Sequence, residues 1–361
     1  MDKGKYKKLN RYHVIFLVSG VMVGFSSLTL VNDLCPMGYH QWVMVLIYGL
    51  IATLTLFPMV SLGLKYPGDN LFTINEKLLG KGLGKIINIF IILYGVLMIS
   101  GISHDYLTLL QLTILTNRDF TLPLLLLLLI TVYIVSGGIK LVARFSIISF
   151  FITFWIVIMA MWPITKGTIT HLFPLFNFTL EDIVISFNGG YKSMMGYELI
   201  MFYFPYIINQ KKAFKDAVLG IWVIIPIYLI NVIACTIYFS LWQIESLRYP
   251  TLSAIKAVEF CFIYRIENIL TAHWVFLILS TTAAYLWMTK KGIDGVLGKI
   301  RAWHLWISVL LIITFIFIPI SRPVEQFLFQ DLTLSMGYGI ILWPVFLLLV
   351  HKGKSLGGKT P

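Results

Sequence analysis

Long apolar stretches separated by short polar ones run the whole length of the chain. Ten of these stretches are long enough, at about 20 residues each, for an α-helix to cross roughly 30 Å of hydrocarbon. The predicted membrane spans are residues 12–34, 41–64, 85–115, 122–138, 145–165, 182–208, 217–241, 268–289, 303–320 and 332–350. The pattern therefore predicts an all-α polytopic membrane protein with ten transmembrane helices.

Composition and the placement of charge agree with this prediction. The chain is 58% hydrophobic and 12% charged, with a mean hydropathy of +0.87, which lies far outside the range of soluble domains. Most of its 28 Lys and Arg residues fall in loops on the side of the N-terminus, including the tail at 352–361. Since basic loops remain in the cytoplasm, we expect both termini to be cytoplasmic. The net charge of +12 follows from this asymmetry beside anionic membrane lipid and does not indicate nucleic-acid binding.

The loop at 166–181 divides the chain into two sets of five spans. We expect a single membrane domain over 1–361, with the first set at 1–165 and the second at 182–351. An odd number of spans gives the halves opposite orientations, so related halves would form an inverted repeat. Such folds bind solutes near the midplane, where the first helix of each half is interrupted.

Both helices at the expected positions carry residues that interrupt a helix. Span one contains Gly20 and the run from Gly24 to Ser27, and span six contains glycines at 189, 190 and 196. Gly destabilises a helix relative to Ala, while Ser hydroxyls can bond the backbone groups that a break releases. Small residues in membrane helices also serve close helix packing. Both explanations stay open for span one, and a ligand site is favoured for span six.

Charged residues within the predicted spans are costly, so they should face a cavity or each other. Lys192 and Glu198 lie on either side of Gly196, six residues apart, which is a poor separation for facing each other on an unbroken helix. A break near Gly196 would relax this constraint. Alternatively, Lys192 extends to the outer interface and Glu198 binds backbone amides or a neighbouring helix. In span three, His104 and Asp105 would suit a water-filled vestibule or an interhelical hydrogen bond, of which we favour the hydrogen bond.

Hydroxyl groups in span eight offer a further lining for a pocket. Thr281 and Tyr285 are four residues apart and share a helix face, as do Tyr94 and Met98 in span three. Such pairs commonly serve packing alone. A midplane pocket for a small polar solute nevertheless needs a few hydroxyls within apolar walls.

A polar segment at 248–267 interrupts the apolar pattern on the side opposite the termini. An apolar stripe at helical spacing predicts a short outer-face helix near 250–264. Arg265 and Glu267 are two residues apart, so on a continuous helix they could not face each other and each would need another partner. We expect them to anchor the mouth of span eight or to dock an outer subunit.

The motifs of soluble enzymes do not occur in this sequence. It contains no nucleotide-binding loop, no zinc-protease helix motif and no nucleophile elbow, so we expect no enzymatic activity, cofactor or metal site. Cys35, Cys235 and Cys261 have no metal-binding spacing; Cys35 and Cys261 could pair, but free thiols are favoured. The first apolar run is too long for a signal peptide and lacks a cleavage site, so we interpret it as a span.

Four short motifs carry a resemblance to a known family. They are Tyr249-Pro250-Thr251-Leu252, Glu259-Phe260, Tyr264-Arg265-x-Glu267 and Gly196-x-Glu198. On these motifs the chain resembles, over nearly its whole length, the endospore germination permease family, the B subunits of spore germinant receptors. That family is similar to the amino acid/polyamine/organocation permeases, whose five-plus-five inverted repeat agrees with the two interrupted spans.

The resemblance implies a role and a set of site residues. The chain would bind a small-molecule germinant, most simply an amino acid, and act with an A subunit and a lipoprotein C subunit in the spore inner membrane. The implied pocket lining is Gly24, Phe25, Ser26, Tyr94, Met98, Met195, Gly196, Thr281 and Tyr285. Glu198 would stabilise the broken helix or couple binding to movement, and Lys192, Arg265 and Glu267 would have gating or structural roles.

The sequence also departs from the family pattern, and it leaves other functions open. Leu30 is followed by Val31 where family members commonly have a Leu-Pro pair, and Ser26 stands where a second glycine is common. The same pocket would serve an amino acid transporter that works by alternating access. An ion or water pathway through the bundle is a third alternative. The resemblance alone favours the sensor.

Overall fold

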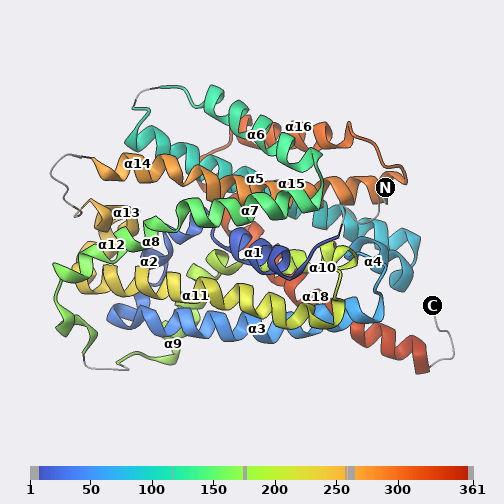
Figure 1. The fold of residues 1–361 in the computed structure, drawn as a ribbon, viewed down its shortest axis with the longest axis horizontal. Helices are drawn as coiled ribbons and strands as arrows, with labels where there is room; N and C mark the ends of the chain where they lie inside the picture. The colour runs from blue at the N-terminus through green and yellow to red at the C-terminus, as the bar shows by residue number, and fades with distance from the viewer. Residues whose placement is uncertain (1–7, 117, 174–176, 257, 259–264, 357–361) are drawn as a thin grey trace.

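A computed structural model describes residues 8–116, 118–173, 177–256, 258 and 265–356, and these residues form a nearly all-helical bundle. Figure 1 shows the longer helices lying side by side along the length of the molecule. Within the described ranges the β-type pairing is a single isolated bridge, between Leu9 and Ile207.

The first half of the chain begins with a broken helix and continues with longer ones. Its elements are α1 (Arg11–Met22), η2 (Phe25–Ser27), α2 (Leu30–Asp33), η3 (Cys35–His40), α3 (Gln41–Lys65), α4 (Leu71–Leu79), α5 (Lys81–Thr113), α6 (Thr121–Ser136), α7 (Ile139–Thr153), α8 (Trp155–Ala160), η4 (Trp162–Thr165) and η5 (Ile169–Leu172).

The second half repeats this plan, with a second broken segment at its start. Its elements are α9 (Leu180–Gly190), η6 (Tyr191–Met194), η7 (Tyr197–Leu199), α10 (Ile200–Tyr203), η8 (Phe204–Tyr206), η9 (Gln210–Lys212), α11 (Ala213–Tyr238), α12 (Leu241–Ser246), α13 (Pro250–Ile255), α14 (Ile266–His273), α15 (Val275–Leu297), α16 (His304–Phe317), α17 (Arg322–Gln326), the π-helical segment η10 (Phe327–Leu332) and α18 (Thr333–Leu356).

The two halves pack against each other reciprocally. α1 packs along α11 of the second half, and the broken segment from α9 to α10 packs along α3 of the first half. Likewise, α5 contacts α16 while α15 contacts α6, and α5 and α15 pack together at the centre. This exchange of corresponding partners is what an inverted repeat produces.

Capping and backbone pairing fix where both broken segments begin and end. The Asn10 side chain accepts a hydrogen bond from the backbone N–H of His13 at 3.0 Å, and so starts α1. Just before it, the Leu9 N–H donates to Tyr206 O at 2.7 Å, and the Ile208 N–H donates to Leu9 O at 3.0 Å. The start of the first broken span is therefore tied to the end of the second.

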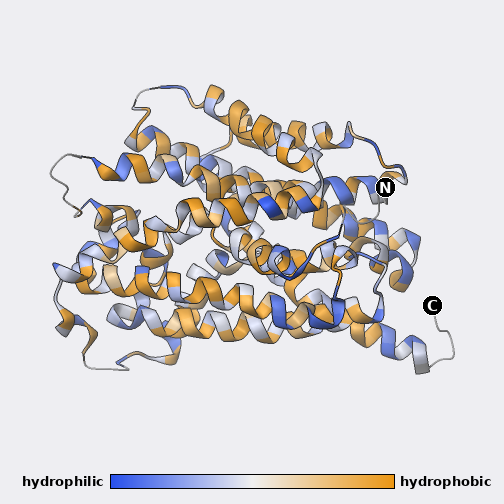
Figure 2. Cartoon of the chain, in the orientation of Figure 1, coloured by the Kyte–Doolittle hydropathy of each residue, from blue (hydrophilic) through white to orange (hydrophobic). Residues whose placement is uncertain are grey.

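The apolar helices fit a membrane. Among the described residues, six helices are long and apolar enough to cross it, and three shorter apolar helices, Arg11–Met22, Thr121–Ser136 and His304–Phe317, accompany them. Figure 2 shows apolar colour along the middle of α3 and α11, with hydrophilic residues at the end of α11 near α4. Because the predicted span at 182–208 consists of short helical pieces, the number of ten crossings stays a prediction.

Several predicted boundaries are wrong because hydropathy does not mark where a helix begins. The predicted loop at 65–85 contains the helix α4, and α7 begins at Ile139, ahead of the predicted start of span five. The polar segment lies as expected at the end of the bundle away from α4 and the last turns of α18 (Figure 1). Of the predicted outer helix at 250–264, the first part is α13, and residues 257 and 259–264 lie outside the described ranges.

Candidate functional site

The first break follows α1 and leaves several carbonyl groups without helical partners. Val23 and Gly24 adopt non-helical conformations, with φ −82° and ψ 75° at Val23 and φ −96° and ψ −155° at Gly24. The Thr281 hydroxyl on α15 lies 3.2 Å from Val21 O, and the Tyr228 hydroxyl on α11 donates to Met22 O at 2.9 Å. Side chains of neighbouring helices thus replace the lost helical bonds.

The second break lies at Met195 and Gly196. Met195 is extended, with φ −68° and ψ 151°, while Gly196 has φ 126°, a conformation that favours glycine. A Cβ atom at Gly196 would lie 2.7 Å from Val21 Cγ1 and 3.0 Å from the Val21 carbonyl carbon. The two breaks therefore touch, and Gly196 is required by both its conformation and its surroundings.

Polar contacts join the two breaks directly. The Tyr228 hydroxyl lies 3.0 Å from Ser193 O as well as 2.9 Å from Met22 O, so one hydroxyl serves both broken segments. The Ser193 hydroxyl donates to Ser26 O at 2.9 Å, and Asn231 Nδ2 donates to Thr251 Oγ1 at 2.9 Å. Sequence reasoning missed Ser193, Tyr228 and Asn231, whereas Ser26 is a predicted site residue and Thr251 belongs to a family motif. The available signal was two polar residues three positions apart within the otherwise apolar span seven.

A buried carboxylate stands at the second break. Glu198 Oε1 accepts hydrogen bonds from the hydroxyls of Tyr94 at 2.8 Å and Tyr285 at 2.7 Å, and Oε2 accepts from the Gly196 N–H at 2.6 Å. The carboxylate is fully buried and its three donors are neutral groups. We call Glu198, Tyr94, Tyr285 and Gly196 the carboxylate cluster.

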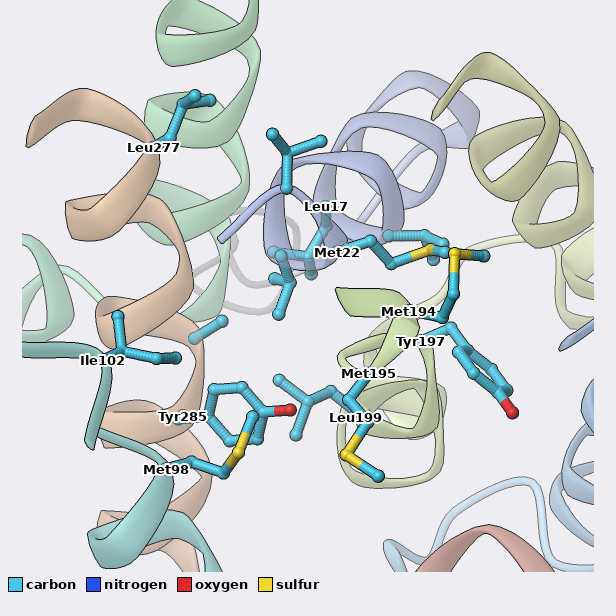
Figure 3. Packing of buried hydrophobic residues seen from close by; sticks show 14 of the residues in the cluster. Leu17, Met22, Met98, Ile102, Met194, Met195, Tyr197, Leu199, Leu277 and Tyr285 are labelled. Carbon is cyan, nitrogen blue, oxygen red and sulfur yellow. The ribbon is translucent and has the colours of Figure 1, made fainter. Parts of the chain in front are cut away.

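Much of the predicted pocket lining gathers around this cluster. The Tyr94 hydroxyl lies 3.8 Å from Met195 Sδ, and Figure 3 shows Met98 beside Tyr285, whose hydroxyl points toward the segment bearing Met195. Gly24 and Thr281 form a second contact, because a Cβ at Gly24 would lie 3.7 Å from Thr281. The predicted residues thus come together, but they pack tightly and their roles stay predictions.

The open space of the site lies to one side of this cluster. A cavity of about 770 Å³, which we call the vestibule, is lined by residues of both broken segments and reaches the polar segment between α12 and α13. Phe25, Ser26 and Lys192 of the predicted site line it. At its rim, burial raises the pKa of the Tyr249 phenol, and the adjacent Arg248 guanidinium opposes that shift.

Lys192 faces the vestibule and not Glu198. Its Nζ donates at 2.7 Å to Phe329 O and at 2.7 Å to Gln330 Oε1, both in the π-helical segment η10. Of the two expected arrangements, Lys192 faces the cavity and does not pair with Glu198. The break turns the chain so that the two side chains leave it toward different neighbours.

His104 and Asp105 in span three both contact neighbouring helices and line the vestibule. His104 Nδ1 lies 3.2 Å from Glu325 Oε1, and the Asp105 carboxylate accepts from Gln330 Nε2 at 3.4 Å, so both residues contact other helices. Both also line the vestibule. The interhelical hydrogen bond and the vestibule are therefore compatible at this position.

Arg265 and Glu267 correct another expectation. Arg265 Nε lies 3.2 Å from Glu267 Oε1, so the two residues pair with each other. Arg265 is the N-cap of α14, with φ −136° and ψ 68°. Because its backbone is not helical, the rule that residues two apart point to different sides of a helix does not apply. Cys35 is a free thiol, and its suggested partner Cys261 lies outside the described ranges.

Charges of both signs surround the vestibule. Besides Lys192 and Asp105, its lining includes residues that the sequence did not single out, namely Asp33, Arg248, Arg322, Glu325 and Gln330. The available signal was an acidic residue at the end of span one and arginines in loops otherwise poor in bases. A cavity with both signs of charge suits a polar or zwitterionic solute.

Comparison with known proteins identifies relatives of one kind. A family model described as "Spore germination protein" matches residues 8–325. Spore germination protein GerQB of Bacillus cereus is 26% identical over 306 residues, covering 84% of this chain and 85% of the relative. Spore germination protein B2 of Bacillus subtilis (strain 168) is 25% identical over 369 residues, covering 97% and 94%.

Two solved structures share the fold. MhsT in complex with L-phenylalanine gives a TM-score of 0.63 at 16% identity, covering 91% of this chain and 87% of that one. Mhp1, a nucleobase-cation-symport-1 family transporter in a closed conformation with bromovinylhydantoin bound, gives 0.61 at 13% identity, covering 92% and 77%. These likenesses concern the fold alone. They confirm the predicted class, an all-α membrane bundle with two interrupted helices.

Proposed function

The chain belongs to the spore germination protein family, and from this premise we propose that it is the B subunit of a spore germinant receptor. In this role it binds a small-molecule germinant, most simply an amino acid, and signals to partner subunits so that germination begins. The chain itself carries out no enzymatic reaction.

One observation carries the proposal from family to mechanism. The vestibule is lined by both broken segments, and these segments meet at Gly196 and Val21 next to the carboxylate cluster. A solute that enters the vestibule therefore contacts both halves of the molecule. Because interrupted helices can move relative to each other, binding there can favour one of two arrangements of the halves.

The charges of the vestibule support an amino acid as the solute. The lining carries positive charge at Lys192 and Arg248 and negative charge at Asp33 and Asp105, so it attracts a solute with both signs of charge into the vestibule. Sugars and nucleosides carry no pair of opposite charges that this lining would complement. This agrees with a zwitterionic germinant.

Location and partners follow from the same premise. The chain is a multi-pass membrane protein, and we propose the spore inner membrane as its site, with both termini in the cytoplasm. The excess of Lys and Arg in loops on the side of the termini supports this orientation. An A subunit and a lipoprotein C subunit are the proposed partners that read the change in the membrane core; membrane lipid surrounds it.

The experiment is a germination screen in spores that carry this receptor and lack the others. Individual amino acids, nucleosides and sugars are supplied, and germination is followed by loss of optical density. We expect amino acids alone to act, and Lys192→Met to abolish the response while the protein still accumulates. A response to nucleosides or sugars only, or an unchanged response of Lys192→Met, would contradict the proposal.

A second candidate function is an amino acid transporter. The fold shared with Mhp1, a transporter by its description, favours it, since the same architecture supports alternating access. Uptake of labelled amino acids into proteoliposomes that contain this chain alone distinguishes the two functions. Accumulation above empty liposomes would favour the transporter, and binding without uptake would favour the receptor.

A further inference from the structure

We propose that the Glu198 carboxylate occupies the place that the carboxylate of the germinant takes, so that the germinant binds by displacing this side chain. The proposal rests on the proposed function, because it concerns the same two helix breaks. It specifies a carboxylate-bearing solute and a means by which the empty receptor is held in one state.

The donors around Glu198 form a receptor for a carboxylate. They come from three separate elements, Tyr94 from α5, Tyr285 from α15 and the Gly196 N–H from the second break, at distances of 2.8, 2.7 and 2.6 Å. Together they bind both oxygens of one carboxylate. Three donors that converge on the two oxygens of one side chain match the acceptors that a carboxylate offers.

Glu198 already occupies the donors of the predicted pocket lining. The two tyrosine hydroxyls and the Gly196 amide already bind it, and the Thr281 hydroxyl lies at hydrogen-bond distance from Val21 O, 3.2 Å away. The side chains concerned are at most 2% exposed, so no water layer separates them. A solute that uses the predicted pocket must therefore compete with Glu198. A carboxylate is the group that matches the donors it releases.

The structure also offers a place for the displaced side chain. Within the part of the chain that the structure describes, the buried hydroxyl of Tyr203 has no hydrogen-bond partner. Tyr203 belongs to α10, which follows Glu198 on the same broken span. A buried donor without a partner costs free energy, which a rotated Glu198 would recover. Gly196, two residues before Glu198, supplies a flexible backbone for this rotation.

Displacement has a measurable consequence for affinity. If the open form is only a minor fraction of the empty protein, the apparent affinity is reduced by that fraction. Weakening the hold on the internal carboxylate should therefore strengthen germinant binding. A purely structural role of Glu198 predicts the reverse, because damage to the site would weaken binding.

The first experiment tests whether the place accepts an external carboxylate. The full chain in lipid nanodiscs, as wild type and as Glu198→Ala, is heated with sodium acetate or with the neutral isostere acetamide at equal concentration and ionic strength. We expect acetate to raise the Tm of Glu198→Ala by a few degrees and to leave the wild type unchanged, since a ligand that binds only the folded state stabilises it. Equal effects of acetate and acetamide on the variant would overturn the proposal.

The second experiment uses Glu198→Gln, which keeps the shape of the side chain. It also serves as the alternative variant in case Glu198→Ala does not fold. Binding of the common L-amino acids and of their primary amides is measured by calorimetry. We expect the amino acid that binds to do so about tenfold more tightly in Glu198→Gln than in the wild type. The matching amide should gain nothing. Unchanged or weaker binding in Glu198→Gln would overturn the proposal.

A third variant tests the displaced position. Tyr203→Phe removes only the unpartnered hydroxyl, so we expect several-fold weaker amino acid binding with an equal or higher Tm. Equal affinity in Tyr203→Phe and wild type would argue against this route. The two hypotheses fail separately: if no amino acid binds to wild type or Glu198→Gln, the proposed function fails, while the acetate experiment still decides whether the carboxylate place exists.

Discussion

The two helix breaks look alike in sequence and differ in structure. Gly24 has φ −96°, which any residue can adopt, and a Cβ there would make only ordinary contact at 3.7 Å. Gly196 has φ 126°, and its Cβ would lie 2.7 Å from Val21. The first break is held by side chains of neighbouring helices, whereas the second binds its own carboxylate. A glycine in a broken helix therefore marks either an adaptable position or an obligatory one, and only the surroundings tell them apart.

The largest difference between the two breaks is expected when each glycine is replaced by alanine. Gly196→Ala should strain the backbone and displace Val21, at a cost of about 3 kcal/mol or more. Gly24→Ala should cost at most about 1 kcal/mol, because both conformation and space allow it. Thermal unfolding in nanodiscs and germination of spores measure the two effects. Equal tolerance of both substitutions would show that the breaks are equivalent.

The carboxylate cluster of the second break comes next in expected effect. Tyr285→Phe removes one hydrogen bond to the buried Glu198 side chain and should lower stability by about 1–3 kcal/mol. Tyr94→Phe should act similarly, and the double variant should deviate from additivity because both hydroxyls bind the same oxygen. Tyr133→Phe, at a side chain that is 74% exposed, is the matched control. Strict additivity would argue that the two tyrosines act independently.

The contact shared by the breaks should have a smaller effect. Tyr228→Phe leaves Met22 O and Ser193 O without their common donor and should cost about 1–2 kcal/mol. Because the hydroxyl touches both segments, its loss should also reduce the germination response more than the change in stability explains. The response is compared with that of Tyr133→Phe spores at equal protein level. A loss of stability with a normal response would limit Tyr228 to a structural role.

At the first break, loss of the Thr281 hydroxyl should have a modest effect on stability. Thr281→Val keeps the volume of the side chain but removes the hydroxyl near Val21 O, and should cost about 1 kcal/mol. The bulkier changes Gly24→Val and Thr281→Leu should abolish the germinant response and leave the protein in the membrane. Immunoblots of spore membranes together with germination assays test both points. Intact germination in both bulky variants would show that the first break does not line the germinant pocket.

The smallest effect is expected away from both breaks. Arg265→Glu reverses the charge beside Glu267, but the Arg265 side chain is 64% exposed. We expect a loss of at most about 1 kcal/mol, as for other exposed ion pairs. A normal ligand response with normal assembly would show that this end of α14 neither anchors the site nor docks an outer subunit. Thermal unfolding and co-purification of partner subunits provide the two measurements.

The sequence allowed the class of fold and the position of both breaks to be predicted, because hydropathy and helix-breaking residues act locally. It did not show that Gly196 touches Val21, since that contact joins distant parts of the chain. The same holds for Lys192, whose partners in η10 are well over a hundred residues away. The pairing of Arg265 with Glu267 is not predictable from their spacing for a different reason. Arg265 caps α14 and is not part of a continuous helix with Glu267.

The pairing of Leu9 with Tyr206 and Ile208 uses main-chain groups alone. Every amino acid except proline presents the same N–H and C=O groups, so this tie between the two broken spans places little demand on side-chain identity. The hydrogen bonds of this tie can therefore persist as these positions drift over evolution, within the limit that the fully buried Leu9 must be replaced by a residue that fits the core. Proline at position 9 or 208 is the substitution that such drift must avoid.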